Sequence, residues 1–305
     1  MSSPRGKILV IRGGAIGDFI LTLPAIAALR KQFPEAHLEV LGYPHIAQLA
    51  QAGGLAARVQ PIEARALAGF FARNGELEEN LADYFSEFDI IVSYLFDPDL
   101  IFETNVRRRS PAQFIAGPHR PDEEESLHAT KVYLKPLERL AIFDADNRPR
   151  LTFNAQPPTL NHLALHPGSG SETKNWPEAH WAELLRRLVE TTPLHFLLVG
   201  GEAEGTRLEK LCGGVPAARC QVAKSLPLPE LAARLQTCAA FIGHDSGITH
   251  LAAAVGLPAL VLWSHTNETI WRPQGERITI LRGTSGLSSL SPERVQTELA
   301  KLLAG

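Results

Sequence analysis

The chain alternates short runs of apolar, β-branched residues with longer stretches in which apolar residues recur every three or four positions. The first pattern is typical of buried strands and the second of helices with one apolar face. Strands that alternate with helices favour a mostly parallel sheet covered by helices on both faces. The expected strands cover residues 7–12, 37–41, 88–93, 162–166, 194–199, 241–243, 259–262 and 278–281, and the expected helices cover 19–32, 45–52, 177–190 and 291–303.

The pattern stops and restarts near the middle of the chain. Residues 144–158 are rich in Pro, Asn, Asp and Gln and show no periodicity, which is typical of a linker. At 305 residues the chain also exceeds the roughly 250–300 residues at which one hydrophobic core stops growing. We therefore predict two α/β domains, residues 1–155 and 156–288, followed by a final helix within 289–305. A ligand site is expected in the cleft between the domains, beyond the carboxyl ends of the strands.

Composition excludes several classes of protein. The formal net charge is −3, so no basic field indicates nucleic acid as a partner. No stretch approaches the roughly 18 apolar residues of a membrane span, and we expect a soluble, cytoplasmic protein. The three cysteines match neither a zinc pattern nor a disulfide framework, so we expect buried, small apolar side chains in a reducing compartment. They are Cys212, Cys220 and Cys238.

The segment 243–250 is the first candidate for chemistry, because it follows an apolar strand and opens a helix of small residues. The free N–H groups of a helix start form an anion site, where Gly247 leaves space for a diphosphate and Ser246 adds a hydroxyl donor. An ordinary N-cap formed by Asp245 or Ser246 is the alternative interpretation. His250, one turn later, favours donor binding.

A Gly/Ser-rich turn after the strand 162–166 is the second candidate. Its backbone donors are suited to phosphate, and Lys174 offers the positive charge that a leaving nucleoside diphosphate needs. The spacing is not that of a P-loop, and an exposed lysine without a function is the alternative for Lys174. The candidate donor-binding residues of this turn are Ser169, Gly170, Ser171 and Thr173.

The third candidate, residues 12–18, joins the first strand to the first helix. Gly13, Gly14 and Gly17 partly resemble a dinucleotide fingerprint, but the full Gly-x-Gly-x-x-Gly spacing is absent. Asp18 lies at the helix start and is expected to face the cleft, where a carboxylate is suited to act as general base for a hydroxyl nucleophile. A favourable interaction of Asp18 with the helix dipole explains the residue equally well.

Other polar residues are interpreted as structural. The run 107–109 of three arginines is expected to be solvated, with a phosphate clamp for an anionic acceptor or lipid head group as the alternative. Four histidines fit no metal-ligand spacing: His119, His128, His180 and His195.

Taken in order, these segments resemble the ADP-heptose:lipopolysaccharide heptosyltransferases, glycosyltransferase family 9. The resemblance extends over most of the chain outside about 60–150. The matching segments are Gly17-Asp18 with Leu23-Pro24, His166-Pro167-Gly168, Lys174-Asn175-Trp176-Pro177, Gly200-Gly201 with Glu204, and 243–258.

The resemblance implies a GT-B fold, in which two Rossmann-like domains with mostly parallel sheets face each other across a cleft and a final helix packs back on the first domain. It implies inverting transfer from an ADP-activated sugar, with no metal and no cofactor, because the nucleotide sugar is a co-substrate. Asp18 would be the base and Lys174 would meet the diphosphate or the sugar. The other implied donor contacts are Glu204 to the ribose, Asp245 to the sugar hydroxyls, and Ser246 and Gly247 to the phosphates.

The implied partners are a nucleotide-diphospho-sugar donor and a glycan or glycolipid acceptor. For the acceptor the resemblance implies peripheral attachment at the cytoplasmic face of the inner membrane. Residues 13–15 are Gly-Gly-Ala, where the family pattern has hydroxyl residues. Residues 263–266 are Trp-Ser-His-Thr, where the family pattern has a Phe-Gly-Pro-like turn. These departures concern the substrates, so a different nucleotide sugar, or a non-catalytic nucleotide-sugar-binding homologue, is the alternative.

Overall fold

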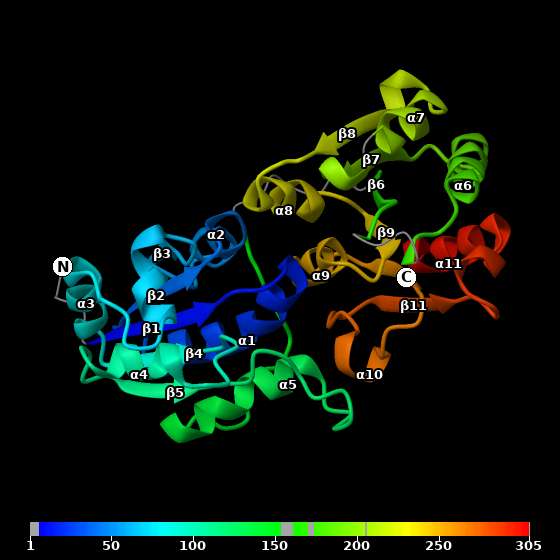
Figure 1. Ribbon diagram of the computed structural model, residues 1–305. Helices are drawn as coiled ribbons and strands as arrows, with labels where there is room; N and C mark the ends of the chain where they lie inside the picture. The colour runs from blue at the N-terminus through cyan, green and yellow to red at the C-terminus, as the bar shows by residue number, and fades with distance from the viewer. Residues whose placement is uncertain (1–5, 154–160, 170–173, 205, 305) are drawn as a thin grey trace. The chain divides into compact units, whose positions relative to one another are not determined.

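A computed structural model describes residues 6–153, 161–169, 174–204 and 206–304. The chain divides after Arg148 into two compact units, each with its own parallel sheet (Figure 1). The boundary expected after residue 155 lies shortly beyond this division.

The first unit has a five-stranded sheet in the order β3-β2-β1-β4-β5, with every pair parallel. Alternate residues of a strand point to opposite faces, and helices cover both. On one face, Leu9 and Ile11 pack into a core with apolar residues of η1, α3 and α4. The elements are β1 (Lys7–Arg12), α1 (Ile16–Gln32), β2 (His37–Gly42), α2 (Pro44–Ala52), β3 (Arg58–Pro61), η1 (Arg65–Phe71), α3 (Glu79–Ser86), β4 (Ile90–Ser93), α4 (Ile101–Arg107), β5 (Gln113–Ala116), α5 (Ala129–Leu134) and η2 (Lys135–Leu140).

The register of the first sheet decides which loops meet. Arg12 at the end of β1 pairs with Gly42 at the end of β2, while Ser93 ends β4 beside Ile11. The residues that follow β1, β2 and β4 therefore leave the sheet at one edge. On the face opposite the Leu9 core, α1 contacts α5 and α2, so α1 is buried along most of its length.

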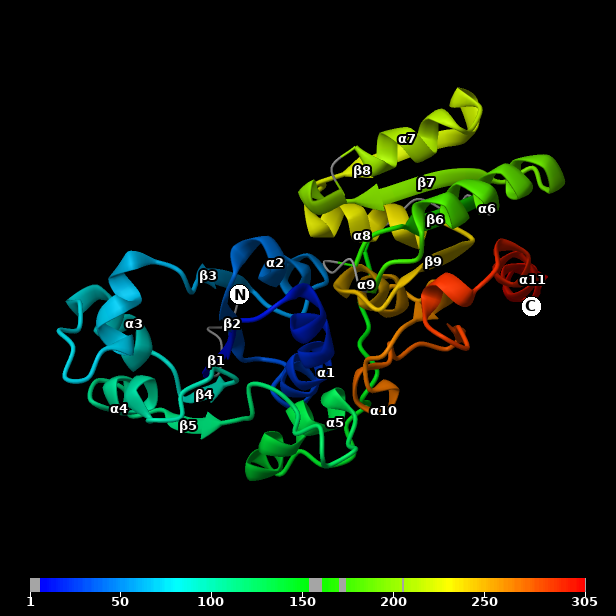
Figure 2. The same cartoon turned by 45° about the vertical axis from the view of Figure 1, so that its right-hand side comes forward.

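The second unit has a six-stranded sheet in the order β11-β10-β9-β6-β7-β8, again with every pair parallel. Helices α6 and α11 lie side by side on one face, and α8 and α9 lie on the other (Figure 2). The elements are β6 (His162–His166), α6 (Glu178–Thr191), β7 (His195–Gly200), η4 (Glu202–Glu204), α7 (Arg207–Gly213), η5 (Ala217–Arg219), β8 (Cys220–Lys224), α8 (Leu228–Gln236), β9 (Ala240–His244), α9 (Gly247–Ala254), β10 (Ala259–Trp263), α10 (Glu268–Trp271), β11 (Ile278–Arg282), η6 (Leu287–Ser289) and α11 (Pro292–Ala304).

The core of the second unit is built around large aromatic side chains. Trp176 and Trp181 are fully buried, with ring centroids 5.1 Å apart at an interplanar angle of 80°. The indole N–H of Trp176 donates to the carbonyl oxygen of Leu290 at 3.0 Å. That bond anchors the segment before α6 to the segment before α11, so the core holds the 174–177 turn in place.

The final helix, α11, belongs to the second unit. Its buried residues Val295, Leu299 and Leu302 join the core formed by α6, α7 and the sheet. Arg187 of α6 also makes an ion pair with Glu293. The packing of this helix on the first domain remains a prediction.

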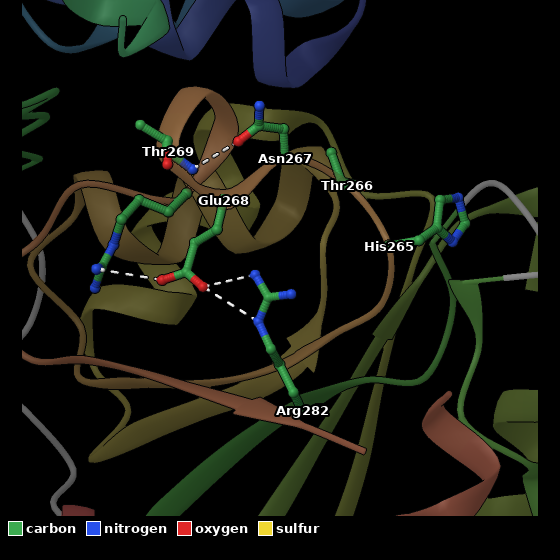
Figure 3. Close-up of a pocket in the computed structure, with 7 residues that line it drawn as sticks. His265, Thr266, Asn267, Glu268, Thr269 and Arg282 are labelled. Atoms are coloured by element: carbon green, nitrogen blue, oxygen red, sulfur yellow. Dashed lines mark hydrogen bonds and ion pairs between the residues drawn. The ribbon is translucent and has the colours of Figure 1, made fainter. Parts of the chain in front are cut away.

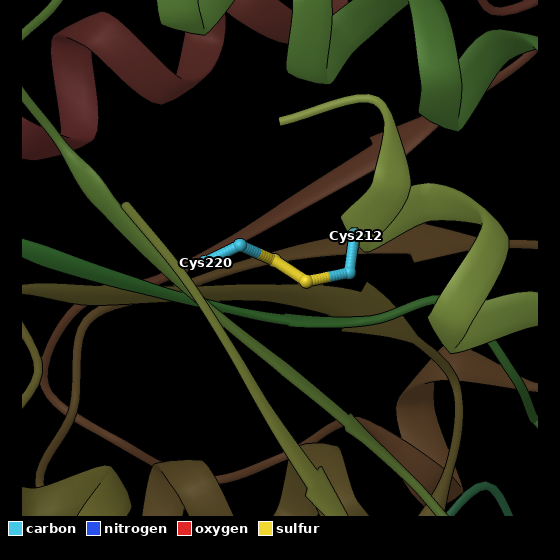
Figure 4. Close-up of a disulfide and its surroundings, with 2 residues drawn as sticks. All are labelled: Cys212 and Cys220. Atoms are coloured by element: carbon cyan, nitrogen blue, oxygen red, sulfur yellow. A yellow bond between two sulfur atoms is a disulfide. The ribbon is translucent and has the colours of Figure 1, made fainter. Parts of the chain in front are cut away.

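The cysteines differ from the expectation. Cys212 near the end of α7 and Cys220 at the start of β8 form a disulfide, with their Cα atoms 5.9 Å apart (Figure 4). Cys238 is buried and free, as expected. Spacing along the chain did not indicate the pair, because the short loop returns the chain to the sheet and so brings the two positions together.

Candidate functional site

Asp18 lies in the first turn of α1, which begins three residues earlier than the sequence pattern indicated. Its Oδ2 accepts a hydrogen bond from the N–H of Ala15 at 3.0 Å, and the side chain is 30% exposed. Gly14 has a φ of +93°, and a Cβ built there would lie 3.0 Å from Asp18 Oδ2. The glycine turn thus lets the carboxylate fold back over the helix start, where the helix dipole stabilises negative charge.

Arg12 is a buried cation beneath this turn, with its side chain only 2% exposed. Its Nη1 donates to the carbonyl oxygens of Tyr94 at 3.2 Å and His119 at 2.8 Å. The guanidinium also lies over the Tyr133 ring, 4.6 Å from the centroid. Its Nη2 donates to the Asp18 carbonyl oxygen at 3.3 Å and lies 3.8 Å from Asp18 Oδ1. These partners replace water around the charge and couple the Asp18 turn to the loops after β4 and β5.

Lys174 and Asp245 form an ion pair in the second unit. Lys174 Nζ donates to Asp245 Oδ2 at 2.9 Å, and the side chains are 27% and 9% exposed. Asp245 directly follows β9, while Lys174 comes from the turn after the neighbouring strand β6. Ser169 of the same turn donates its hydroxyl to Asn175 Oδ1 at 2.7 Å.

His244 holds these two loops together. Its Nδ1 lies 3.2 Å from the carbonyl oxygen of Gly168, and its Nε2 accepts from the N–H of Trp176 at 2.8 Å. Accepting at Nε2 leaves the proton on Nδ1, where it is donated to Gly168. Burial lowers the pKa of His244 to about 3, so the ring is neutral at pH 7.

Helix α9 begins at Gly247, and Ser246 is its N-cap. The Ser246 hydroxyl accepts from the N–H of Thr249 at 3.4 Å and lies 3.3 Å from His166 Nδ1. The N-cap predicted as the alternative for Ser246 is therefore present, and it is compatible with an anion at the remaining N–H groups. His250 is buried one turn into the helix.

Glu204 follows β7 and is buried against glycines of two loops, Gly168 after β6 and Gly200 and Gly201 at the end of β7. Its Oε2 accepts from the N–H of Gly201 at 2.5 Å, and a Cβ on Gly168 would overlap its Oε1. His166 Nε2 lies 3.9 Å from Glu204 Oε1. Burial lowers the pKa of His166 to about 4, so this contact joins a neutral ring to the carboxylate.

The structure thus gathers most of the predicted donor residues at the carboxyl edge of the second sheet. Lys174 pairs with Asp245, and Ser246 connects through His166 to Glu204. The predicted residues Gly170, Ser171 and Thr173 lie outside the described residues. Asp18, Gly13, Gly14 and Gly17 lie at the carboxyl edge of the first sheet.

Sequence reasoning assigned no role to Arg12, His166 or His244. Each ends a strand, and a polar residue that closes an apolar run is the signal that could have singled it out. The partners of each side chain come from other loops, so its role depends on tertiary contacts. The arginine run is partly engaged, because Arg107 pairs with Glu103 at 2.8 Å and Arg108 donates to the carbonyl oxygen of Gly75 at 3.2 Å.

A polar pocket of about 480 Å³ opens beside the loop after β10, in the region where the sequence departs from the family pattern (Figure 3). Glu268 points between two arginines, with its Oε2 2.7 Å from Arg282 Nη2 and its Oε1 3.4 Å from Arg272 Nη1. His265 and Asn267 line the same pocket. One carboxylate thus lies between two guanidinium groups, and the three side chains carry a net charge of +1.

Two kinds of feature are absent from the part of the chain that the structure describes. Within residues 6–153, 161–169, 174–204 and 206–304, no three His, Cys, Asp or Glu side chains lie together as metal ligands. Over the same ranges, no helix has the length and apolar character of a transmembrane segment.

Comparison with known proteins shows which family and which relatives this chain is similar to. Residues 128–301 match the family model of glycosyltransferase family 9 (heptosyltransferase). Lipopolysaccharide heptosyltransferase 1 of Pseudomonas aeruginosa is 27% identical over 290 residues, covering 86% of this chain and 79% of the relative. Lipopolysaccharide heptosyltransferase 3 of Escherichia coli is 23% identical over 296 residues, covering 84% and 83%.

The fold has close counterparts among solved structures. The E. coli heptosyltransferase WaaC, solved with ADP, superimposes with a TM-score of 0.77 at 18% identity, covering 97% of this chain and 99% of WaaC. The expected α/β fold of the GT-B class is thereby confirmed. With the family model spanning more than half of the sequence, the chain belongs to glycosyltransferase family 9 and is a glycosyltransferase.

Proposed function

We propose that the chain transfers heptose from ADP-heptose to a lipopolysaccharide-core or related glycan, by an inverting, metal-independent reaction. The observation that carries the proposal is the cluster of Lys174, Asp245, Ser246 and Glu204 at the carboxyl edge of the second sheet. The relatives named as lipopolysaccharide heptosyltransferases, and WaaC solved with ADP, support this choice of substrates.

The donor site has a part for each portion of the nucleotide sugar. The start of α9 offers free N–H groups to the diphosphate, with the cation of Lys174 nearby. Lys174 is already held by Asp245, so its ammonium is in place before the ligand arrives. Glu204 offers carboxylate acceptors to the ribose hydroxyls, and Asp245 offers them to the sugar. Ser169, Gly247 and His250 complete the proposed donor site, together with Gly170, Ser171 and Thr173.

Asp18 is the proposed general base. The acceptor hydroxyl attacks the anomeric carbon while its proton passes to the Asp18 carboxylate. The bond from that carbon to the diphosphate oxygen breaks, and ADP leaves. A single displacement from the opposite face inverts the configuration. Arg12 and Ala15 orient the base, and the loop of Gly13, Gly14 and Gly17 borders the acceptor.

The acceptor and the location follow from the same proposal. For a lipid-linked glycan acceptor we expect peripheral attachment at the cytoplasmic face of the inner membrane. A transferase for a different nucleotide sugar is the second candidate, favoured by Gly13-Gly14-Ala15 and by Trp263-Ser264-His265-Thr266, where the sequence departs from the family pattern.

A thermal-shift panel with ADP, UDP, GDP and dTDP and their sugar conjugates tests the donor. We expect ADP-heptose and ADP to stabilise the protein, by about 2.7 kcal/mol at roughly 100 times Kd. A Lys174→Met variant should bind ADP about 10-fold more weakly, because it loses a charge-assisted contact to phosphate. Lys210→Met, which removes an exposed lysine of the same unit, is the control.

Each outcome of the panel is decisive. Preferential stabilisation by a different nucleotide would replace the ADP donor with that one. Absence of any shift, or an equal loss in the Lys174 and Lys210 variants, would contradict the donor site.

A further inference from the structure

Two aromatic rings lie together at the carboxyl edge of the first sheet. Phe96 follows β4 and His119 follows β5, and their ring centroids are 4.6 Å apart. Phe96 is 71% exposed, more than any other large apolar side chain in the part of the chain that the structure describes. A phenylalanine that is exposed and yet held against a second ring offers its free face to a ligand.

This pair of rings is connected to the turn that carries Asp18. The carbonyl oxygen of His119 accepts from Arg12 Nη1 at 2.8 Å, and Arg12 Nη2 donates to the Asp18 carbonyl oxygen at 3.3 Å. Leu95, next to Phe96, lies within 3.8 Å of a Cβ built on Gly13. The rings and the proposed base are thus held at the same edge by one buried arginine.

The His119 ring is suited to stacking because it is neutral. The His119 side chain is exposed, but partial desolvation and the nearby Arg12 and Arg120 guanidinium groups lower its pKa below the ordinary value, against an opposing effect of Asp18. An uncharged ring keeps its π face available and carries no strongly bound water shell.

We propose that Phe96 and His119 form a stacking platform for one sugar ring of the acceptor glycan. The C–H bonds on one face of a pyranose are weakly positive, and they pack against the negative face of an aromatic ring. The platform would hold the glycan so that the hydroxyl of the acceptor sugar reaches Asp18. This inference rests on the proposed transfer to a glycan and names the surface that receives it.

The surroundings favour a sugar over an acyl chain. Asp97 directly follows Phe96, Asp99 lies two residues further along, and Arg120 follows His119, so charged residues flank both rings in the chain. A lipid tail needs a wide apolar surface, and the carboxylates repel anionic lipid head groups. A pyranose combines one apolar face with a rim of hydroxyls, which matches this arrangement.

The test compares steady-state kinetics of the full-length protein with a delipidated, heptose-free core oligosaccharide as acceptor and ADP-heptose as donor. For Phe96→Ala we expect the acceptor KM to rise about 3- to 10-fold while the donor KM stays within about twofold. His119→Ala should raise the acceptor KM as well, and Phe96→Trp should retain the wild-type value. Phe143→Ala, which removes another exposed phenylalanine of the same unit at 64% exposure, is the matched control.

Saturation-transfer NMR with the same oligosaccharide measures binding without turnover. The platform predicts transfer from aromatic protons to the glycan that is lost in Phe96→Ala and kept in Phe143→Ala. An unchanged acceptor KM in Phe96→Ala, or equal effects of the Phe96 and Phe143 variants, would overturn the platform and leave the proposed transfer intact. If transfer is absent but Phe96-dependent glycan binding persists, the proposed reaction fails and the platform stands. Binding that requires an acyl chain on the acceptor would also overturn it.

Discussion

At the scale of single residues, Asp18 both stabilises a helix start and is the proposed general base. Asp18→Asn keeps the size of the side chain and can still accept from Ala15 N–H, but it cannot take a proton from a hydroxyl. We expect kcat to fall by about 10²- to 10⁴-fold, the usual contribution of a general base. The measurement is the initial rate of ADP release with a glycan acceptor.

Two observations separate lost chemistry from lost structure in that variant. Its thermal shift with ADP should equal that of the wild type, because the proposed donor residues lie in the other unit. Asp83→Asn, an exposed change on α3, should leave the rate unchanged. A rate close to wild type in Asp18→Asn would eliminate Asp18 as the base.

Two glycines with positive φ provide a matched pair. Gly14 (φ +93°) faces the Asp18 carboxylate, whereas a Cβ on Gly54 (φ +72°) would meet nothing within 4 Å. Alanine at either position should lower the unfolding free energy by about 1–2 kcal/mol, the cost of a left-handed backbone. Only Gly14→Ala should also reduce turnover, because its methyl group displaces the carboxylate. Denaturant unfolding and initial rates measure the two effects, and equal turnover in both variants would refute the role of Gly14.

The sequence predicted Asp18 at a helix start, but not what holds it. Residues of one loop, such as Gly14 and Asp18, are close in the chain, and their relation follows from local backbone geometry. The contacts of Arg12 with Tyr94 and His119 join residues about 80 to 110 positions apart. No local pattern specifies such contacts, because they depend on which strands become neighbours in the sheet.

At the scale of elements, long apolar runs were predicted well and short mixed ones were not. The strands β1 and β6 match their predicted ranges, 7–12 and 162–166. The strand β3, Arg58–Pro61, was missed, because its four residues include Arg, Gln and Pro and none is fully buried. The 3₁₀ helix η1, Arg65–Phe71, has neither the strand nor the α-helix period, so periodicity could not indicate it.

The disulfide between α7 and β8 gives a prediction about these elements. Cross-linking residues separated by 8 positions should add about 2–3 kcal/mol of stability, mainly by restricting the unfolded chain. A reducing agent should therefore lower the unfolding free energy of the wild type and leave a Cys212→Ser, Cys220→Ser double variant unchanged. Denaturant titrations with and without reductant measure this. Equal responses of the two proteins would show that the bond does not contribute.

At the scale of the whole molecule, buried neutral histidines make stability depend on pH. Burial lowers the pKa of His166 to about 4 and that of His244 to about 3, from an ordinary 6.5. Below pH 6.5 these histidines become protonated in the unfolded chain but stay neutral in the folded chain. The unfolding free energy should therefore fall as the pH is lowered towards 4. Each histidine contributes up to about 1.4 kcal/mol per pH unit in that range.

Denaturant unfolding at several pH values measures this slope. His166→Gln cannot titrate and should show a shallower decrease than the wild type between pH 6.5 and 4. His37→Gln, which replaces a partly exposed histidine of the first unit, is the control. Equal slopes in all three proteins would contradict the buried, neutral state of His166.

The division of the chain into two units follows from its repeated strand–helix pattern and its polar linker. The placement of donor groups at one sheet edge follows from parallel topology, since the loops after β6, β7 and β9 leave the sheet on the same side. The pocket around Glu268 could not be predicted in this way. Arg272 is one helical turn from Glu268, but Arg282 meets Glu268 only when β11 pairs with β10.

The aromatic core of the second unit has a spectroscopic consequence. All four tryptophans of the chain, at 176, 181, 263 and 271, lie in that unit, and all four tyrosines, at 43, 84, 94 and 133, lie in the other. Light absorbed only by indole therefore excites one half of the molecule. Trp176 donates its backbone N–H to His244 and lies two residues after Lys174, so one of the four indoles that emit is at the donor loops and can report on them without a label. Intrinsic tryptophan fluorescence therefore has a source at the place where the nucleotide ligand is expected to bind.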